Sequence, residues 1–566
     1  MVDQTLLLLS VGPVQSFIAS ARKTEDLWGG SYILSYLVEQ AISQLEAAVA
    51  ELGSSVELIF PAASQVETAI EVASFPNRLL VMVNLPAEVA SALGEEIAEF
   101  IREQFVEISS FAIDDAFAGS AVDRKYMKEM AKEQVLELLE ITWAVEPLGD
   151  NYELARKRLE SRLAAIKNNR DYGANLQDGL VCTVCGEWEA LHAEPYPPMA
   201  KVGLMKKQLR QTWDNLQAKY RPKDESDEED NQPGRIRRNE HLCGICLSKR
   251  TLRDYFRVIK SRNIKGFRST LKIAGEQSNY YAIIVMDGDD MGQWLSGNKG
   301  QFPEPAGSIE YHRIISKRLN RFAGQQVPKL VAEAGGDLVY AGGDDVLAFV
   351  PLKNALDLCN KLRTAFSNPD YGLHSEATAS IGMTVIHEKH PLSSALRNAR
   401  RMEQKAKNYI NPYTKVQKDA IGIAVYSRSG EQRETVFPWI VDGENMIAIM
   451  QNLEQLLKDD ISTTFLHRFG EAFLPLVGAH KKSAKIRLFD GRDQQEELLA
   501  LELTRLLERS VLDEAANNEK IKSFIPEMAR DMAKVHEIMT SSLQFVHWLE
   551  TVDFMRRKLK EGRKNA

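Results

Sequence analysis

The chain has 566 residues, 44% of them hydrophobic, and a formal net charge of −8. Its length favours about three to five domains. Its acidity excludes a protein coated in basic charge, so contacts with nucleic acid must come from local patches or from partner subunits. The apolar run Leu6–Leu9 is too short for a signal peptide, and no run reaches the length of a membrane span. Four of the five cysteines form two C-x-x-C pairs, which fits a reducing compartment. We therefore expect a cytoplasmic protein without membrane contact.

Residues 1–120 have the pattern of a ferredoxin-like unit. Thr5–Val11 predicts a strand that ends at Gly12-Pro13, and the apolar residues after it have helical spacing. The expected order is strand, helix, two strands, helix. The elements expected after the first strand are a helix to about Trp28, a helix from Tyr32 to about Leu52, strands Val56–Pro61 and Leu79–Asn84, and a helix Ala87–Gln104. Gly29, Gly30 and Ser31 then lie between two helices, where they either cradle a phosphate or simply let the chain turn.

Residues 121–277 predict a helical domain with a metal site. The segment from Asp123 to about Lys167 is charged and helical in pattern, with an interruption around Pro147–Asp150. Two C-x-x-C pairs follow, formed by Cys182, Cys185, Cys243 and Cys246. Four thiolates match the tetrahedral preference of Zn²⁺, and reduced or redox-active cysteines are the alternative. A closed site of this kind is structural, so we assign it no catalytic role.

The segment between the two cysteine pairs is strongly charged. The acidic run Asp224–Asp230 predicts a disordered loop. Arg235, Arg237 and Arg238 follow at once, and they form either a phosphate-contacting patch or part of a solvated loop.

Residues 278–430 predict a second αβ unit of the same order as the first. The elements expected in it are strand Tyr280–Met286, a helix near Ser308–Glu333, a hairpin at Asp337–Leu352, helix Asn354–Phe366, strand Ala377–Ile386, helix Leu392–Asn408 and strand Ala420–Tyr426. Cys359 lies on one of these helices, where a buried core thiol is the simplest interpretation. The fold class is thus α+β with several domains.

Acidic residues follow a strand and form the tip of the hairpin in this second unit. The strand Tyr280–Met286 leads into Asp287-Gly288-Asp289-Asp290, and the hairpin turns at Gly342-Gly343-Asp344-Asp345. Unpaired neighbouring carboxylates repel each other, and a bound divalent cation relieves that repulsion. Asp287, Asp344 and Asp345 are therefore candidate ligands of Mg²⁺, and ordinary acidic surface turns are the alternative. Lys405 and Lys407, late on the helix Leu392–Asn408, are candidates for contact with a triphosphate, with surface lysines as the alternative.

Residues 431–566 predict a C-terminal helical domain. The expected helices are Glu444–Leu457, Glu496–Leu512 and Phe524–Lys560. The basic tail from Arg556 onwards either contacts RNA or a partner, or is a frayed charged terminus.

These motifs together resemble a known family. Val11–Ile18, Asp26–Ser31, Asp287–Gly292, Gly342–Asp345 and the two C-x-x-C pairs resemble the large palm-domain subunit of type III CRISPR effector complexes, of the Cmr (type III-B) kind. The resemblance covers nearly the whole chain. Members of this family often begin with an HD nuclease domain that cuts single-stranded DNA. None of the ten histidines here is followed by Asp, so we expect no such domain in this chain.

The resemblance implies two ferredoxin-like palm domains, a zinc-binding helical domain between them and a helical C-terminal domain. It implies synthesis of cyclic oligoadenylate from ATP, in antiviral defence, once a complex of Cmr subunits and guide CRISPR RNA has bound complementary target RNA. Asp287, Asp344 and Asp345 would hold two Mg²⁺ or Mn²⁺ ions roughly 3.5–4 Å apart. Gly288, Gly342, Gly343 and Lys407 would contact one ATP, and Gly29, Gly30 and Ser31 would hold a second. The alternatives are a catalytically silent scaffold that holds guide RNA and partner subunits, and a stand-alone nucleotide cyclase.

Overall fold

The computed structural model describes residues 4–62, 75–169, 177–221, 234–262, 264, 266–477, 492–513 and 518–562. They divide into two compact units. The first comprises Met1–Ser269, Met291–Pro328 and Val339–Asp344, and the second comprises Thr270–Asp290, Lys329–Leu338 and Asp345–Ala566. Within the described ranges, no helix is both long and apolar enough to cross a membrane. The acidic run 224–230 lies outside the described residues.

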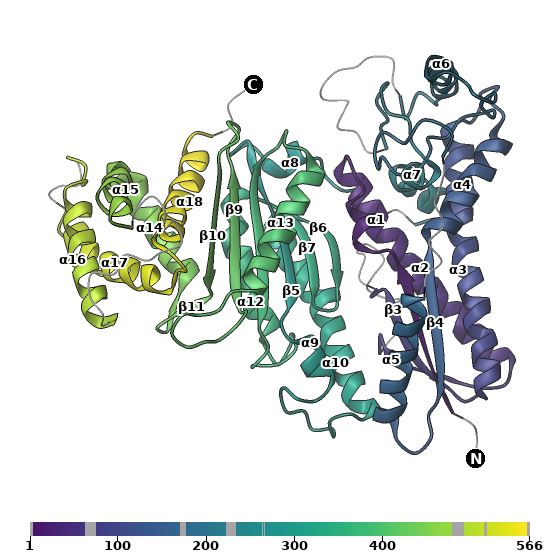
Figure 1. The fold of residues 1–566 in the computed structure, drawn as a ribbon, viewed down its shortest axis with the longest axis horizontal. Coiled ribbons are helices and arrows are strands. Elements are labelled where there is room, and N and C mark those ends of the chain that lie inside the picture. Colours follow the sequence, from purple (N-terminus) through teal and green to yellow (C-terminus); the bar gives the residue numbers. More distant parts are fainter. Residues whose placement is uncertain are drawn as a thin grey trace. The chain divides into compact units, whose positions relative to one another are not determined.

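A four-stranded antiparallel sheet organises the first unit (Figure 1). Its strands lie in the order β2-β3-β1-β4. They are β1 (Thr5–Gly12), β2 (Val56–Phe60), β3 (Arg78–Val83) and β4 (Glu140–Pro147). The helices that connect them are α1 (Gln15–Ala19), α2 (Thr24–Glu51), α3 (Ala87–Ala116) and α4 (Arg124–Leu138). The central strand β1 is almost wholly buried, as its uninterrupted apolar run requires.

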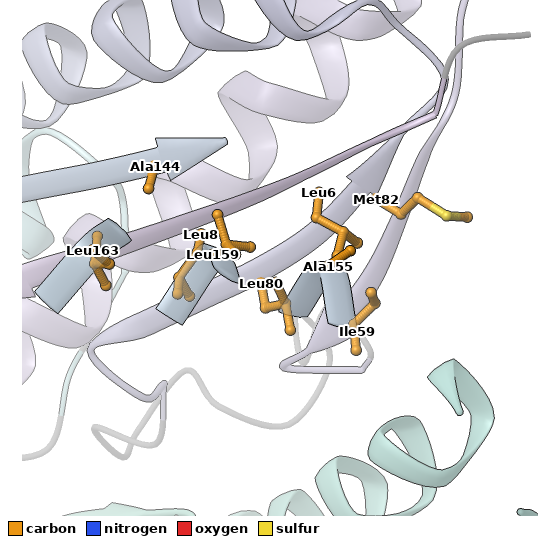
Figure 2. Packing of buried hydrophobic residues seen from close by; sticks show 9 residues of the cluster. All are labelled: Leu6, Leu8, Ile59, Leu80, Met82, Ala144, Ala155, Leu159 and Leu163. Carbon is orange, nitrogen blue, oxygen red and sulfur yellow. The ribbon is translucent and has the colours of Figure 1, made fainter. Parts of the chain in front are cut away.

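One face of this sheet is covered by α5 (Tyr152–Asn168). Ala155, Leu159 and Leu163 recur at helical spacing and pack against the alternate side chains Leu6 and Leu8 of β1 (Figure 2). The charged residues of α5 lie on its other faces. The helix is therefore amphipathic, and its apolar stripe forms part of the core of the first unit.

Two predictions for the first unit are wrong. Residues 140–147, which we expected to be helical, form β4, which pairs along the whole length of β1. The β-favouring run Ile141–Val145 gains sheet hydrogen bonds and partial burial, and these outweigh the helical pattern on either side of it. The expected helix boundary at Trp28–Ser31 is absent as well, because α2 runs from Thr24 through the glycines to Glu51.

The boundary between the two helices lies earlier in the chain, between the end of α1 at Ala19 and the start of α2 at Thr24. The Asp26 carboxylate accepts hydrogen bonds from the backbone N–H groups of Arg22 and Lys23, which fixes the start of α2. The glycines inside α2 face α7 (Gly244–Val258). A Cβ at Gly29 would lie 2.3 Å from the carbonyl oxygen of Lys249. The two glycines thus allow the backbones of α2 and α7 to approach closely.

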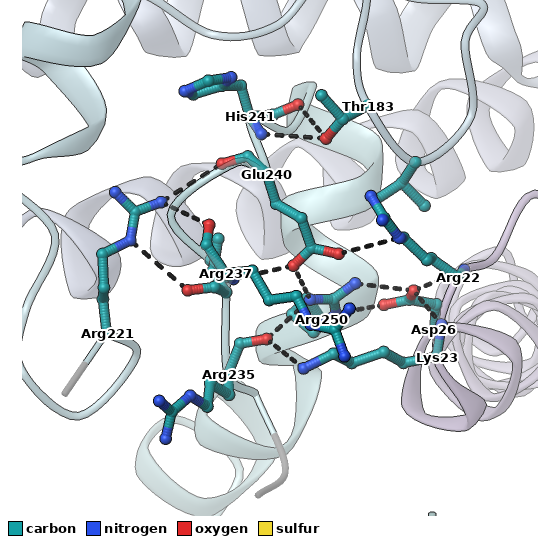
Figure 3. A network of polar contacts seen from close by, with 12 residues as sticks. Arg22, Lys23, Asp26, Thr183, Arg221, Arg235, Arg237, Glu240, His241 and Arg250 are labelled. Carbon is teal, nitrogen blue, oxygen red and sulfur yellow. Dashed lines mark hydrogen bonds and ion pairs between the residues drawn. The ribbon is translucent and has the colours of Figure 1, made fainter. Parts of the chain in front are cut away.

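Buried charges hold α7 against the start of α2 (Figure 3). The Arg250 guanidinium donates to both oxygens of Asp26 and, at 3.1 Å, to Glu240. It also donates to the Arg235 carbonyl at 2.7 Å. All three charged side chains are almost completely inaccessible to solvent. Arg235, one of the arginines that we considered for phosphate contact, is itself buried, with a relative exposure of 4%.

A mixed six-stranded sheet organises the second unit, in the order β10-β9-β8-β5-β7-β6, although residues 339–342 of β6 are assigned to the first unit. Its strands are β5 (Tyr280–Gly288), β6 (Asp337–Gly342), β7 (Asp345–Pro351), β8 (Ala379–His387), β9 (Ala420–Tyr426) and β10 (Gln432–Pro438). β5 is antiparallel to both of its neighbours, and β8 and β9 are parallel. The helix α12 (Ala355–Phe366) precedes β8, and α13 (Leu392–Lys407) packs on β5, β8 and β9.

The last part of the chain is helical, as predicted, but it also contributes a strand. β10 pairs with β9 along its whole length, so the sheet continues beyond residue 430. The helices are α14 (Met446–Asp459), α15 (Thr464–Val477), α16 (Arg492–Glu508), α17 (Glu519–Ile538) and α18 (Ser542–Lys560). The single helix expected over Phe524–Lys560 is thus two helices. The Ser541 side chain accepts from the Gln544 N–H and begins α18.

Candidate functional site

Three carboxylates come together where β5 ends and the β6–β7 hairpin turns. Met286 of β5 pairs with Val346 of β7, so the next residue of β5, Asp287, and the preceding residue of β7, Asp345, lie at the same end of the strand pair. Asp344 occupies the turn between β6 and β7. One ligand oxygen from each of the three side chains lies within 4.8 Å of the other two. This separation suits a shared divalent cation, for which carboxylate oxygens are the preferred ligands.

The hairpin glycines have different surroundings. Gly343 has a φ of +70°, which disfavours other residues, and a Cβ there would meet nothing within 4 Å. A Cβ at Gly342 would lie 1.7 Å from the Tyr340 hydroxyl oxygen. Gly343 is thus selected by backbone conformation, and Gly342 by the packing of a neighbouring side chain.

Helix α13 places two cations and a buried carboxylate beside the three aspartates. The Lys407 ammonium lies 2.5 Å from Asp287 Oδ1 and 3.8 Å from Glu403 Oε1. Burial opposes the charge of Lys407, but its hydrogen bond to Asp287 and the nearby carboxylates outweigh that effect and raise its pKa. Burial raises the pKa of Glu403. Burial also lowers the pKa of Arg400, while attraction to Asp345 and Glu403 opposes that shift.

Asp289 has a different role from Asp287, although the two residues are separated only by Gly288. Its carboxylate accepts hydrogen bonds from Thr378 Oγ1 (2.9 Å), Ser380 Oγ (2.8 Å) and the Asp419 N–H (3.0 Å). The side chain is buried, and burial raises its pKa. Asp289 therefore ties the segment after β5 to the strands β8 and β9, which fixes the position from which Asp287 projects.

Sequence reasoning missed Asp289, Arg400 and Glu403. The signal for the last two was helical spacing, because Arg400, Glu403 and Lys407 follow one another by three and four residues and share a face of α13. The other candidate lysine, Lys405, lies on a different face and pairs with Glu434.

The glycine segment of the first unit is buried. Gly29 and Gly30 pack against Lys249 of α7. The Ser31 hydroxyl is within hydrogen-bonding distance of the Trp28 carbonyl (3.0 Å) and of the carbonyl of Val339 (2.6 Å), which is assigned to the same compact unit. These residues are thus largely engaged in packing.

The four cysteines of the C-x-x-C pairs form one cluster. Their sulfur atoms all lie within 4.8 Å of one another, and those of Cys185 and Cys243 are 3.9 Å apart. The Cys246 N–H donates to Cys243 Sγ, and the Val184 N–H donates to Cys182 Sγ. The donor set and its compactness fit a tetrahedral zinc ion.

Comparisons with known proteins agree with this arrangement. Residues 280–421 match the family model described as Cas10/Cmr2, second palm domain, and residues 6–110 match that of CRISPR-associated protein Cmr2, N-terminal. The chain is 27% identical, over 627 aligned positions, to the CRISPR system Cmr subunit Cmr2 of Pyrococcus furiosus, and the alignment covers 87% of this chain and 70% of that protein. The chain belongs to the Cas10/Cmr2 family.

Solved structures share the fold. The type III-B Cmr-beta structure in the apo state matches with a TM-score of 0.62 and 15% identity, over 90% of this chain and 77% of the matched chain. The Cmr-beta structure bound to cognate target RNA gives a TM-score of 0.61 and 15% identity, over 91% of this chain and 79% of the other. Within this Cas10/Cmr2 chain, the palm match includes Asp287, Asp344, Asp345 and Lys407.

Proposed function

We propose that this chain is the catalytic palm subunit of an RNA-guided type III-B effector complex, which converts ATP to cyclic oligoadenylate by nucleotidyl transfer when target RNA is bound. The observation that carries the proposal is the meeting of Asp287, Asp344 and Asp345 within 4.8 Å, inside a segment that matches the second palm domain of Cas10/Cmr2. Three carboxylates this close together repel one another unless cations bind between them, and nucleotidyl transfer uses divalent ones.

Asp287, Asp344 and Asp345 would hold two Mg²⁺ or Mn²⁺ ions. Such ions lower the pKa of an attacking 3′-hydroxyl and neutralise charge on the phosphates. Lys407 and Arg400 add positive charge beside the carboxylates, where a triphosphate would need it. The open space around Gly343 leaves room for the nucleotide. Gly342 directly precedes Gly343 in the chain, and Gly288 directly follows Asp287. The Gly29–Ser31 site for a second ATP rests on the family resemblance alone, because these residues are buried.

We propose a matching domain organisation. The order β2-β3-β1-β4 of the first sheet and the order β8-β5-β7-β6 inside the second are the same arrangement of a β-α-β-β-α-β unit. This supports two ferredoxin-like palms, in about residues 1–120 and 278–430. In each, one strand of the sheet lies beyond those bounds, namely β4 in the first palm and β10 in the second. Residues 121–277 would carry a structural zinc ion on Cys182, Cys185, Cys243 and Cys246, and residues 431–566 would form the helical C-terminal domain.

The proposed partners are the other Cmr subunits, guide CRISPR RNA and complementary target RNA, in the cytoplasm. The similarity to Cmr2 of Pyrococcus furiosus supports the assembly. The net charge of −8 indicates that partner subunits supply much of the positive surface around the RNA.

The test is a thin-layer assay with labelled ATP and Mg²⁺, using the chain in its guide-loaded complex, with matching and with non-matching RNA. We expect cyclic product with matching RNA only, and loss of product when Asp344 and Asp345 are both replaced by Ala. A Glu434→Gln complex is the control, since Glu434 pairs with Arg401 and Lys405 on α13 away from the carboxylates. An intact wild-type complex that makes no product would identify a scaffold, and product from the double Ala variant would refute the site.

A further inference from the structure

The contact between Lys407 and Asp287 raises a question about the proposed cation site, on which this inference rests. The ammonium is 2.5 Å from Asp287 Oδ1, so one candidate metal ligand is already paired with a positive charge. A divalent cation bound by the same carboxylate would lie within a few ångströms of that ammonium. At this separation a divalent cation and an ammonium group repel each other, and the repulsion is stronger where solvent is excluded. Binding of the cation and the position of Lys407 must therefore be coupled.

The Glu403 carboxylate is a second acceptor within reach of the Lys407 ammonium. It lies one helical turn before Lys407 on α13, and its Oε1 is 3.8 Å from the Lys407 nitrogen. Glu403 is 5% exposed, and this Oε1 atom makes no hydrogen bond to any residue that the structure describes. A buried carboxylate oxygen without a hydrogen-bond donor is costly, so Glu403 Oε1 is a favourable acceptor for the Lys407 ammonium. Among the described residues, the other oxygen, Oε2, accepts a hydrogen bond only from the Gln404 side-chain amide, at 3.3 Å.

The backbone around Glu403 is held firmly, so Glu403 stays in place while the lysine side chain moves. A Cβ at Gly382 of β8 would lie 2.2 Å from the Glu403 nitrogen and 2.2 Å from the Ala399 carbonyl oxygen. The two backbones are therefore in direct contact at this point. Lys407, in contrast, has a flexible side chain that keeps 23% of its surface exposed.

We propose that Lys407 is a placeholder cation for the carboxylate site: its ammonium neutralises Asp287 until a divalent cation binds, and Glu403 is the positioning residue that then receives it. Glu403 is not a ligand of the cation. It keeps the displaced ammonium beside the site, where it is available to a nucleotide triphosphate. The arrangement makes the empty site less repulsive and favours loading of metal together with nucleotide over metal alone.

The test measures Mn²⁺ binding to the full chain by electron paramagnetic resonance without nucleotide, with the Asp344→Ala/Asp345→Ala chain as the blank. Lys407→Met removes the competing cation, so we expect Mn²⁺ to bind about fivefold more tightly or better. Glu403→Gln removes the alternative acceptor and should weaken Mn²⁺ binding severalfold. A second titration measures ATP binding at saturating Mn²⁺, and there Lys407→Met should weaken the binding of ATP. A general loss of structure would weaken the binding of both ligands, so it would not give tighter Mn²⁺ binding together with weaker ATP binding.

The double variant Lys407→Met/Glu403→Gln separates this inference from simple charge removal. If Glu403 acts through Lys407, Glu403→Gln should have little effect on Mn²⁺ affinity once Lys407 is gone. An equal effect in both backgrounds, or unchanged Mn²⁺ affinity in Lys407→Met, would overturn the proposal. Glu434→Gln is the matched control, because Glu434 lies on β10 and pairs with Arg401 and Lys405 of α13. Glu403→Asp replaces Glu403→Gln if thermal unfolding shows that the latter misfolds. Mn²⁺ binding by wild type no stronger than by the blank would refute the cation site itself.

Discussion

The Arg250 guanidinium and the Asp26 carboxylate form a buried ion pair between α7 and α2, with Nη2 2.9 Å from Oδ2. The pair is shared with Glu240, whose Oε2 is 3.1 Å from Nη1. Burial of three charged groups is tolerated because each one has a partner of opposite charge, and Asp26 accepts two backbone N–H groups as well. Burial alone would raise the pKa of Asp26, but the attraction to Arg250 and these hydrogen bonds lower it.

Replacement of Arg250 by Met should strongly destabilise the first unit. The substitution leaves two buried carboxylates without their cation, and we expect the free energy of unfolding to fall by roughly 3–5 kcal/mol. The measurement is denaturant unfolding of the full chain. Arg257→Met is the control, because Arg257 lies on the same helix and pairs with Asp254 but is 62% exposed. A surface pair of that kind contributes less than about 1 kcal/mol, so equal effects of the two variants would contradict the prediction.

Replacement of Gly29 by Ala should loosen the contact between α2 and α7. Alanine normally favours a helix over glycine by about 1 kcal/mol. Here, however, the new methyl group would lie 2.3 Å from the Lys249 carbonyl oxygen, and we expect a net loss of about 1–3 kcal/mol. At Gly203, in the helix α6 (Val202–Trp213), an added methyl group would meet nothing within 4 Å. Gly203→Ala should therefore be neutral or stabilising in thermal unfolding, and a stabilising Gly29→Ala would show that the helices have room between them.

Glu25 should make the stability of the first unit dependent on pH. Its side chain is 4% exposed, and one of its oxygens has no hydrogen-bond partner among the residues that the structure describes. Burial raises its pKa from 4.5 to about 7, against the attraction of Arg253. Between these two pH values the folded chain binds more protons at Glu25 than the unfolded chain, so the free energy of unfolding should fall as pH rises from 4.5 to 7. Glu25→Gln resembles the protonated acid and should remove this dependence.

The check on Glu25 is thermal or denaturant unfolding at about pH 5 and about pH 8, on either side of the raised pKa. Relative to wild type, Glu25→Gln should gain roughly 1–3 kcal/mol between the lower and the higher pH. Glu95→Gln, on the exposed surface of α3, should gain nothing. A Glu25→Gln chain that parallels wild type at both pH values would mean that Glu25 is ionised in the folded state.

The two aspartates Asp287 and Asp289 should respond differently to substitution. Asp289→Ala leaves the buried Ser380 hydroxyl and the half-buried Thr378 hydroxyl and Asp419 N–H without their acceptor, at a cost of roughly 2–4 kcal/mol. Asp287→Ala should change stability by less than about 1 kcal/mol, because Asp287 is partly exposed and lies among other carboxylates, yet it should abolish Mn²⁺ binding. Thermal unfolding and metal titration of both variants measure this, and a destabilised Asp287→Ala chain with normal metal binding would reverse the two roles.

The sequence reveals the local parts of the site and not its tertiary parts. Asp287 and the Asp344–Asp345 turn are predictable because apolar strand runs end at them, and the register of a hairpin is a local property. The Cys182–Cys185 and Cys243–Cys246 pairs are recognisable by their spacing. The role of Glu403 depends on how α13 lies on β8, which no local pattern encodes. The strand β4 was missed for a similar reason, since its pairing partner β1 lies far away in the sequence.

The contrast between the two hairpin glycines has a consequence for related sequences. The restriction at position 342 comes from the Tyr340 hydroxyl group, whereas the restriction at 343 comes from the backbone angle alone. Positions 340 and 342 should therefore covary among homologues: a larger residue at 342 should occur together with a smaller one at 340. Position 343 should vary independently of both and accept chiefly asparagine or aspartate, which tolerate a left-handed backbone. An alignment of palm domains would thus record two separate evolutionary constraints within one pair of glycines.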